Sequence, residues 1–264
     1  MQVSLPRFLC RLPLLGRLPL LACLLLLPAG CAKSPGGVVS NSSSGPQVFV
    51  TMTVAGNLNP NYYYYVLFNV NEAKGPGTGL SGPVPVVAAP YGNGFAAGAF
   101  TNYIEYHNGQ PGGTNFGFWT ISSDLLTPSY LGSSSPYLVQ ARAGSNTFTV
   151  QIPLAALATA NTPTAAIQNI EVNFIATNIV PPPGDTLTPK YVDSLYPTTD
   201  PSSLNRFIII PTTQSGIYQN SDQGLEPGGD VSQYVNGFPT AVTPSQLPDV
   251  GSLDITDWSV RISS

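Results

Sequence analysis

Apolar and polar residues alternate with a period of two along most of the chain after residue 46, between clusters of Gly, Pro and Asn. Such alternation predicts β-strands that bury one face. Val48, Val50, Met52 and Val54 fall on one face of the first strand. Residues 62–70 are apolar on both faces, which is typical of a strand in the middle of a sandwich.

Two turn sequences predict hairpins. Asn108-Gly109 separates apolar segments at 100–107 and 116–121, and both turn positions tolerate positive φ. Gly144-Ser145-Asn146 likewise separates 137–141 from 147–152. Late strands are expected at 207–210 and 253–262, and a short helix only at 153–160. The residues predicted to point inward are Phe148, Val150, Ile152, Ile170, Val172, Phe174 and Ala176, with Glu171 and Asn173 pointing outward.

These strands predict an all-β protein. Residues 47–264 are expected to form a single antiparallel β-sandwich, jelly-roll-like, because strand signals run throughout and no long polar linker or repeat divides them. Residues 31–46 are rich in Ser, Gly and Pro and are predicted to be a flexible tether. Residues 1–30 are predicted to be a signal peptide.

The leader carries Arg7, Arg11 and Arg17 before an apolar stretch at 18–29, which is too short to span a bilayer. Pro28-Ala29-Gly30-Cys31 resembles the lipobox of bacterial lipoproteins, although the family usually has Leu where Pro28 stands. The resemblance implies a diacylglyceryl group on Cys31, cleavage before it, and a lipid-anchored cell-envelope protein. In a Gram-negative host, Ala32 after the cysteine implies the outer membrane.

Two alternatives remain for the leader. Ordinary cleavage after Ala29 would give a secreted protein, and lipidation at Leu20-Leu21-Ala22-Cys23 would use an earlier cysteine.

The body also resembles a known sandwich class. The segments at 147–157, 170–175 and 192–195 follow one another in an order similar to the second half of DOMON and family 9 carbohydrate-binding domains. The resemblance implies a sandwich, and it implies sugar or haem as ligands. Some DOMON domains hold haem through Met and His, here Met52 and His107, but core packing also explains Met52.

Composition excludes several chemistries. All three cysteines lie within the first 31 residues, so the body has no disulfide framework, thiol nucleophile or thiolate metal site. Beyond the leader, six basic residues face thirteen acidic ones, a net charge of −7. That balance does not favour nucleic acid as a partner.

Two candidate sites carry metal or catalytic chemistry. Residues 220–230 place oxygen ligands at alternate positions of a Gly-rich loop, which predicts a calcium site, with a plain acidic loop as the alternative. Its ligands would be Asn220, Asp222, Glu226 and Asp230. His107, the only histidine, has no accompanying Gly-x-Ser-x-Gly elbow and is expected at a surface turn.

The aromatic residues suggest binding instead of catalysis. They offer flat faces for sugar rings or peptide side chains, although half-buried strand positions also suit them. The candidates are Tyr62 to Tyr65, Tyr91, Tyr103, Tyr106, Trp119 and Trp258. We therefore expect a non-catalytic binding module for a glycan or an envelope protein.

Two other functions stay open. One is a polysaccharide hydrolase with paired carboxylates drawn from Glu72, Glu105, Glu171 and the nine Asp residues, and the other is a purely structural surface component.

Overall fold

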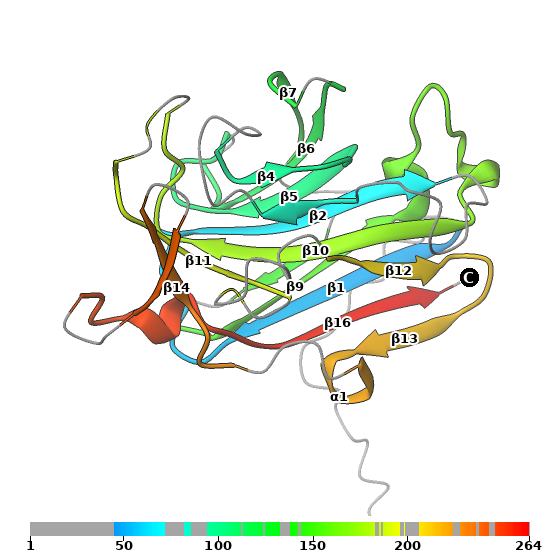
Figure 1. The fold of residues 1–264 in the computed structure, drawn as a ribbon. Coiled ribbons are helices and arrows are strands. Elements are labelled where there is room, and N and C mark those ends of the chain that lie inside the picture. The colour runs from blue at the N-terminus through cyan, green and yellow to red at the C-terminus, as the bar shows by residue number, and fades with distance from the viewer. Residues whose placement is uncertain are drawn as a thin grey trace, which may run out of the picture. The chain divides into compact units, whose positions relative to one another are not determined.

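The computed structural model of this protein consists mainly of antiparallel strands (Figure 1). Asn41–Ser264 forms one compact unit. The structure describes residues 45–71, 82–85, 94–111, 113–123, 125–132, 138–141, 144–182, 185, 187–195, 198, 206–223, 228–235, 238–242 and 246–263. No helix in these ranges is long and apolar enough to cross a membrane.

Two sheets pack face to face, and a two-stranded sheet is added outside them. Sheet A has the order β13 (Gly216–Gln219), β16 (Ile255–Ser263), β1 (Gln47–Val54), β9 (Thr147–Pro153) and β8 (Leu138–Ala141). Sheet B has the order β15 (Phe238–Ala241), β14 (Ser232–Val235), β11 (Lys190–Ser194), β10 (Asn169–Thr177), β2 (Tyr63–Asn71), β5 (Asn102–Tyr106), β6 (Phe116–Ile121) and β7 (Pro128–Gly132), and β12 (Ile208–Pro211) also pairs with β10.

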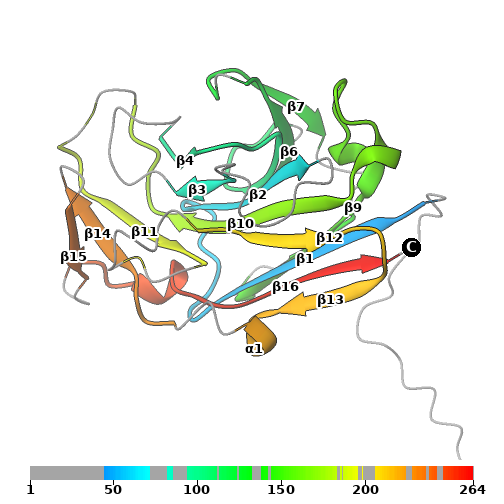
Figure 2. The same cartoon turned by 45° about the vertical axis from the view of Figure 1, so that its right-hand side comes forward.

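The remaining elements are short. β3 (Val84–Pro85) pairs with β4 (Ala96–Ala97), and both lie beside sheet B in Figure 2. The helical turns are η1 (Leu154–Leu157), η2 (Thr164–Ala166), α1 (Asn220–Gln223) and η3 (Val250–Ser252).

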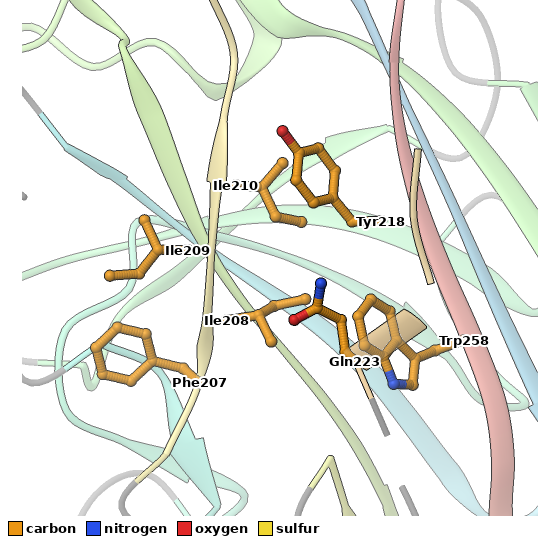
Figure 3. Close-up of a pocket in the computed structure, with 7 residues that line it drawn as sticks. All are labelled: Phe207, Ile208, Ile209, Ile210, Tyr218, Gln223 and Trp258. Carbon is orange, nitrogen blue, oxygen red and sulfur yellow. The ribbon is translucent and has the colours of Figure 1, made fainter. Parts of the chain in front are cut away.

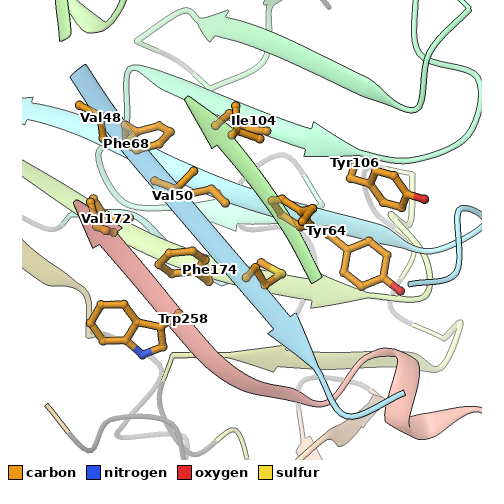
Figure 4. Packing of buried hydrophobic residues seen from close by; sticks show 14 of the residues in the cluster. Val48, Val50, Tyr64, Phe68, Ile104, Tyr106, Val172, Phe174 and Trp258 are labelled. Carbon is orange, nitrogen blue, oxygen red and sulfur yellow. The ribbon is translucent and has the colours of Figure 1, made fainter. Parts of the chain in front are cut away.

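The main core lies between the two sheets because every central strand buries alternate residues there. In the pairing of β1 with its neighbours, Val50 stands opposite Val150 on β9 and Val260 on β16. Figure 4 shows Val48 and Val50 of sheet A facing Phe68, Val172 and other side chains of sheet B. Removal of this apolar surface from water is the main force that holds the layers together.

A second, smaller core lies on the outer side of sheet B. Phe95 and Phe100, from the segment around β4, pack there against Tyr65 and Tyr103. Lys190 on β11 donates a hydrogen bond from Nζ to the Gly94 carbonyl at 2.7 Å, and burial lowers the pKa of this lysine to about 7. Because of this added layer, sheet B buries apolar side chains on both of its faces.

The predicted all-β sandwich is confirmed, and so are all nine strands expected from the pattern. The predicted helix at 153–160 is a single 3-10 turn, η1. Glu171 and Asn173 do point outward, but both are buried. Asn69 on β2 donates to the Glu171 carboxylate at 2.7 Å, and Asn173 donates to the Pro83 carbonyl at 2.9 Å. The outer layer therefore covers positions that alternation alone assigns to solvent.

Candidate functional site

The most distinctive surface lies on the outer side of sheet B, over β2, β5, β6 and β7. Strand alternation sends Tyr64 and Tyr106 into the main core and turns their neighbours outward. We call the outward set the aromatic face: Tyr63, Tyr65, Tyr103, His107, Trp119 and Tyr130. The run of four tyrosines at 62–65 is thus divided between two environments by its period of two.

The rings of the aromatic face contact one another in a continuous series, because the Tyr65 ring centroid lies 6.2 Å from that of Tyr63 and 6.0 Å from that of Tyr103. Tyr63 stacks on His107, with ring centroids 3.8 Å apart and planes at 7°. On the other side of β5, Trp119 stacks parallel to Tyr103 at 6.1 Å and meets Tyr130 edge-on at 5.0 Å. Tyr65 and Tyr103 are buried beneath the face, whereas Tyr63, His107, Trp119 and Tyr130 remain partly accessible.

A buried acid occupies the middle of this face. Glu105 on β5 stands opposite Tyr65 on β2 and Gly117 on β6 in the strand pairing. Tyr65 donates its hydroxyl to the Glu105 carboxylate at 3.3 Å. Burial raises the pKa of Glu105, although hydrogen bonds from Gln110 and Tyr65 oppose this shift. The carboxylate is buried, so its hydrogen bonds to Tyr65 and Gln110 hold the residues of the face in place.

Gln110 connects the acid to the tryptophan. Its Oε1 accepts a hydrogen bond from Trp119 Nε1 at 3.2 Å, and its side chain also hydrogen-bonds Glu105. Glu105 thus holds Gln110 in place, and Gln110 in turn fixes the orientation of the Trp119 ring. Gly117 makes the room: a Cβ at this position would lie closer than 3.0 Å to Gln110 Oε1 and to Trp119 Nε1. A glycine in a strand often marks such a close approach.

Apart from Glu105, the aromatic face presents uncharged groups at neutral pH. Burial lowers the pKa of His107, which favours its neutral form. Burial, together with the charge of Glu105, raises the pKa of Tyr63 and of Tyr103, so these phenols keep their protons and can donate. Flat rings and phenol donors suit a ligand that has both apolar faces and hydroxyl groups.

Comparisons with known proteins add no candidate ligand. Neither a family model, nor a curated protein, nor a solved structure matches this chain.

A second cluster of chemistry-bearing groups lies where the two sheets meet. We call Asp193, Asp230 and Asp254 the acid cluster, because one carboxylate oxygen from each lies within 4.8 Å of the others. Asp193 on β11 is fully buried and accepts hydrogen bonds from the Ser194 and Ile255 amides. Burial, and then the charge of Asp230, raises the pKa of Asp193 well above its usual range.

The other two acids of the cluster also bind backbone amides. Asp230 accepts from Thr198 N at 3.0 Å, and Asp254 accepts from Gly229 N at 2.6 Å. Three hard oxygen donors at this spacing resemble part of a calcium coordination shell, which needs six to eight oxygens. The cluster can therefore contribute to such a site, but the described residues supply only three of its carboxylates.

The predicted calcium loop is divided in the structure. Asn220 and Asp222 lie in α1, where Asn220 donates to the Thr256 carbonyl at 3.3 Å. Asp230 instead joins the acid cluster, and Glu226 lies outside the described residues. Of the predicted calcium ligands that the structure describes, only Asp230 therefore lies in the acid cluster. Asp193 and Asp254 could not be found from spacing along the chain, because they are distant in sequence.

Two pockets are lined by residues that the structure describes. One, of about 270 Å³, lies among β12, β13, β16 and α1 (Figure 3). It is lined by Phe207, Ile208, Ile209, Ile210, Tyr218, Gln223 and Trp258. The other, of about 320 Å³, is lined by Leu58, Pro60, Tyr106, Asn115, Phe116, Ala141 and Gly144. Asn115 is also a neighbour of the aromatic face, because its carbonyl accepts the His107 amide at 2.8 Å.

Several residues that the sequence suggested for binding are structural. Tyr64, Tyr106 and Trp258 belong to the main core, and Tyr62 donates its hydroxyl to Asp249 at 2.6 Å. Tyr91, Glu72 and Cys31 lie outside the described residues.

The structure does not bring Met52 and His107 together. Met52 is buried between the sheets, whereas His107 stacks on the outer face of sheet B. The haem pair suggested by the DOMON resemblance is therefore not formed by these two residues.

Two buried glutamates share the outer side of sheet B, but they are far apart. Glu105 pairs with Tyr65, and Glu171 pairs with Asn69, on opposite sides of β2. Two strand spacings and four residues of rise separate their Cα atoms by roughly 16 Å. A glycosidase holds its two carboxyl groups about 5 to 10 Å apart. Glu105 and Glu171 do not make such a pair.

Proposed function

We propose that this protein is an exported, lipid-anchored envelope protein whose β-sandwich binds carbohydrate through the aromatic face. The observation that carries the proposal is the Trp119 arrangement. Its partly accessible ring is held by Gln110 beside a buried carboxylate, Glu105, and Gly117 leaves the space that this arrangement needs.

The chemistry of sugars matches this surface. A pyranose ring has an apolar face of C–H groups that packs on flat aromatic rings, while its hydroxyls require hydrogen-bond partners. Tyr63 and Trp119 supply partly accessible rings, and the phenol groups of Tyr63 and Tyr130 supply polar partners. Such a combination of apolar area and a few placed polar groups is how ligand sites obtain both affinity and orientation.

The leader sequence supports the proposed lipid-anchored location of the protein. Cys31 follows an apolar stretch of signal length and small residues, and the Ser/Gly/Pro-rich segment at 32–46 would hold the sandwich away from the lipid surface. Attachment of several acyl chains would anchor the protein firmly, whereas a single chain would not.

Glycan binding is tested with the purified full chain in detergent on an array of oligosaccharides. The wild type should be retained by at least one glycan, and Trp119→Ala should weaken that binding about tenfold or more, as expected for loss of a central aromatic contact. Phe49→Ala is the matched control, because Phe49 is a partly exposed aromatic on the outer face of the other sheet. Retention by no glycan, or equal losses in both variants, would overturn the proposal.

Lipid attachment is tested separately by metabolic labelling with an alkyne analogue of palmitate. Labelling should be lost in Cys31→Ser and kept in Cys23→Ser. The reverse result would assign the anchor to Cys23, and no labelling of the wild type would indicate a secreted protein.

A further inference from the structure

The pocket among β12, β13, β16 and α1 lies at an edge where the two sheets end beside each other (Figure 3). β13 is the last strand of sheet A, and among the described strands β12 pairs with β10 alone. The chain passes from sheet B to sheet A between β12 and β13, at residues 212–215. The pocket is therefore an opening between the two layers of the sandwich.

Hydrogen bonds fix both sides of this opening. Thr212, directly after β12, donates its amide to the Gln168 carbonyl at 2.9 Å and its hydroxyl to the Ile167 carbonyl at 2.7 Å. On the other side, Asn220 of α1 donates to the Thr256 carbonyl at 3.3 Å, which holds α1 against β16. The volume of about 270 Å³ is thus formed by the fold itself, as ligand sites usually are.

The pocket is apolar at its floor and polar at its rim. Ile208, Ile210 and Trp258 are buried, whereas Gln223 is exposed. Figure 3 shows Ile208 and Ile210 pointing from β12 toward Tyr218 and Trp258, with the Gln223 amide beside the indole. Hydrocarbon walls with a few polar groups suit a ligand whose body is apolar and whose orientation is fixed by hydrogen bonds.

One polar atom in this lining lacks a partner. The Trp258 side chain is 1% exposed, and its Nε1 is buried without a hydrogen-bond acceptor among the residues that the structure describes. Folded proteins pair nearly all buried donors, because an unpaired donor loses its hydrogen bond to water and gains nothing in return. An indole N–H can only donate. A ligand in the pocket that Trp258 lines can supply the missing acceptor.

The donor and the walls restrict the chemistry of this ligand. A hydrocarbon would leave Nε1 unpaired, and a carboxylate would lose its hydration among isoleucine side chains, which is costly. A neutral carbonyl oxygen accepts a hydrogen bond and needs no donor of its own. The volume is a little under twice that of a cavity of roughly 150 Å³ that takes up benzene, so it holds about ten non-hydrogen atoms.

We propose that this pocket binds a small neutral carbonyl compound, a ketone, ester or amide with an apolar body, whose oxygen accepts a hydrogen bond from Trp258 Nε1. The site is separate from the aromatic face, which lies on the outer side of sheet B. Its ligand therefore does not depend on the proposed carbohydrate binding.

The test follows the indole N–H signals of the full chain by nuclear magnetic resonance. The chain has two tryptophans, so labelling tryptophan with a nitrogen isotope gives two such signals, which Trp119→Phe assigns. The probes are acetophenone, ethylbenzene and benzoate, which carry a neutral carbonyl, no oxygen and a carboxylate on the same ring.

Acetophenone should move the Trp258 signal downfield in a saturable way. It should bind about fivefold more tightly than ethylbenzene, as expected for one additional hydrogen bond, and more tightly than benzoate. Absence of a saturable change at Trp258 would overturn the proposal. Binding of ethylbenzene or benzoate that is as tight as that of acetophenone would overturn it as well.

A rim variant tests whether the chain supplies the acceptor itself. In Gln223→Ala without a probe, the Trp258 signal should stay where it is in the wild type. An upfield movement would show that the Gln223 carbonyl accepts the indole N–H in solution, and it would overturn the proposal.

A filled pocket tests the location. Ile208→Phe should abolish the response of Trp258 to acetophenone, and an unchanged Trp119 signal reports that the fold is intact. Ile217→Phe is the matched control, because Ile217 is 59% exposed on the outer side of sheet A and should leave the response unchanged. A response that persists in Ile208→Phe would place acetophenone elsewhere and overturn the proposal.

Discussion

The outer faces of sheets A and B carry different kinds of side chain. On sheet A, outward threonines of β1 and β9 pair across the strands: Thr51 contacts Thr149 at 3.0 Å between hydroxyl oxygens, and Thr53 contacts Thr147 at 2.9 Å. On sheet B, the equivalent positions carry stacked aromatic rings around a buried glutamate.

The two faces also differ in what their side chains cost the fold. Cross-strand threonine pairs contribute a fraction of a kcal/mol each and keep a sheet soluble, and nothing about them requires a particular ligand. Burial of a carboxyl group opposes its ionisation, and a folded protein tolerates that cost where the group is hydrogen-bonded. In sheet B, Glu105 is such a buried carboxyl group, and Gly117 beside it leaves room for the Gln110 side chain.

The largest expected effect is a difference in stability between substitutions on the inner and on the outer face of β9. Phe148→Ala on β9 should lower the free energy of unfolding by about 3 to 5 kcal/mol, because the ring is fully buried between the sheets and its loss leaves a cavity. Thr149→Ala, one residue along, should cost about 1 kcal/mol or less, since it removes only one hydroxyl pair. Urea denaturation measures both, and equal costs would contradict the assignment of faces.

Addition of calcium tests whether the acid cluster, which lies where the two sheets meet, holds a metal ion. If the acid cluster completes the calcium site that the sequence predicts, calcium at about 100 times its dissociation constant should stabilise the protein by about 2.7 kcal/mol. Asp254→Asn should abolish this gain, whereas Asp222→Asn should not, because Asp222 lies in α1 and outside the cluster. Thermal melts with calcium and with EDTA provide the measurement. A gain lost only in Asp222→Asn would place the site in the loop, and no gain would make the calcium prediction wrong.

Gly117→Ala should damage sheet B where the same change is harmless in sheet A. The new methyl group would displace Gln110 and the Trp119 indole, and overpacking of this kind costs about 1 to 3 kcal/mol of stability. Glycan affinity should fall as well, because Trp119 loses its hydrogen-bonded position.

Gly216→Ala on β13 is the matched control for this change. At that position a Cβ would meet Tyr218 only at ordinary contact distance, 3.4 Å. Denaturation and array binding of the two variants check both effects. Unchanged Trp119 fluorescence and affinity in Gly117→Ala would show that Gln110 does not position the indole.

The smallest effect is a pH dependence of stability at Glu105. Because its pKa in the folded state is raised above the ordinary 4.5, the stabilising contribution of this carboxyl is fully present below that ordinary value and is lost as pH rises through the raised pKa. Glu105→Gln, which stays neutral, should therefore gain stability relative to the wild type as pH rises. Melting temperatures of both proteins from pH 4 to pH 8 give the difference, and a gap that closes with rising pH would contradict the shift.

Part of the candidate site could be predicted from the sequence. The aromatic candidates included Tyr63, Tyr65, Tyr103 and Trp119, but the sequence alone did not separate them from Tyr64 and Tyr106, which the structure places in the main core. Glu105 was foreseen only as one acid among many. Gln110, Gly117 and Tyr130 were missed, because their importance depends on which strands pair and on where the loop after β5 folds back.

By itself, the sequence determined the fold class and the inward face of each main strand, because a period of two in apolar residues is a local property that burial enforces everywhere along a strand. It also indicated the lipoprotein leader, as a prediction. Only the tertiary structure decided which outward positions are covered, which acids become neighbours, and which aromatics share a surface. These depend on contacts between residues such as Asp193 and Asp254, which are far apart in the chain, and the strand order that joins them is set by the packing of the whole domain.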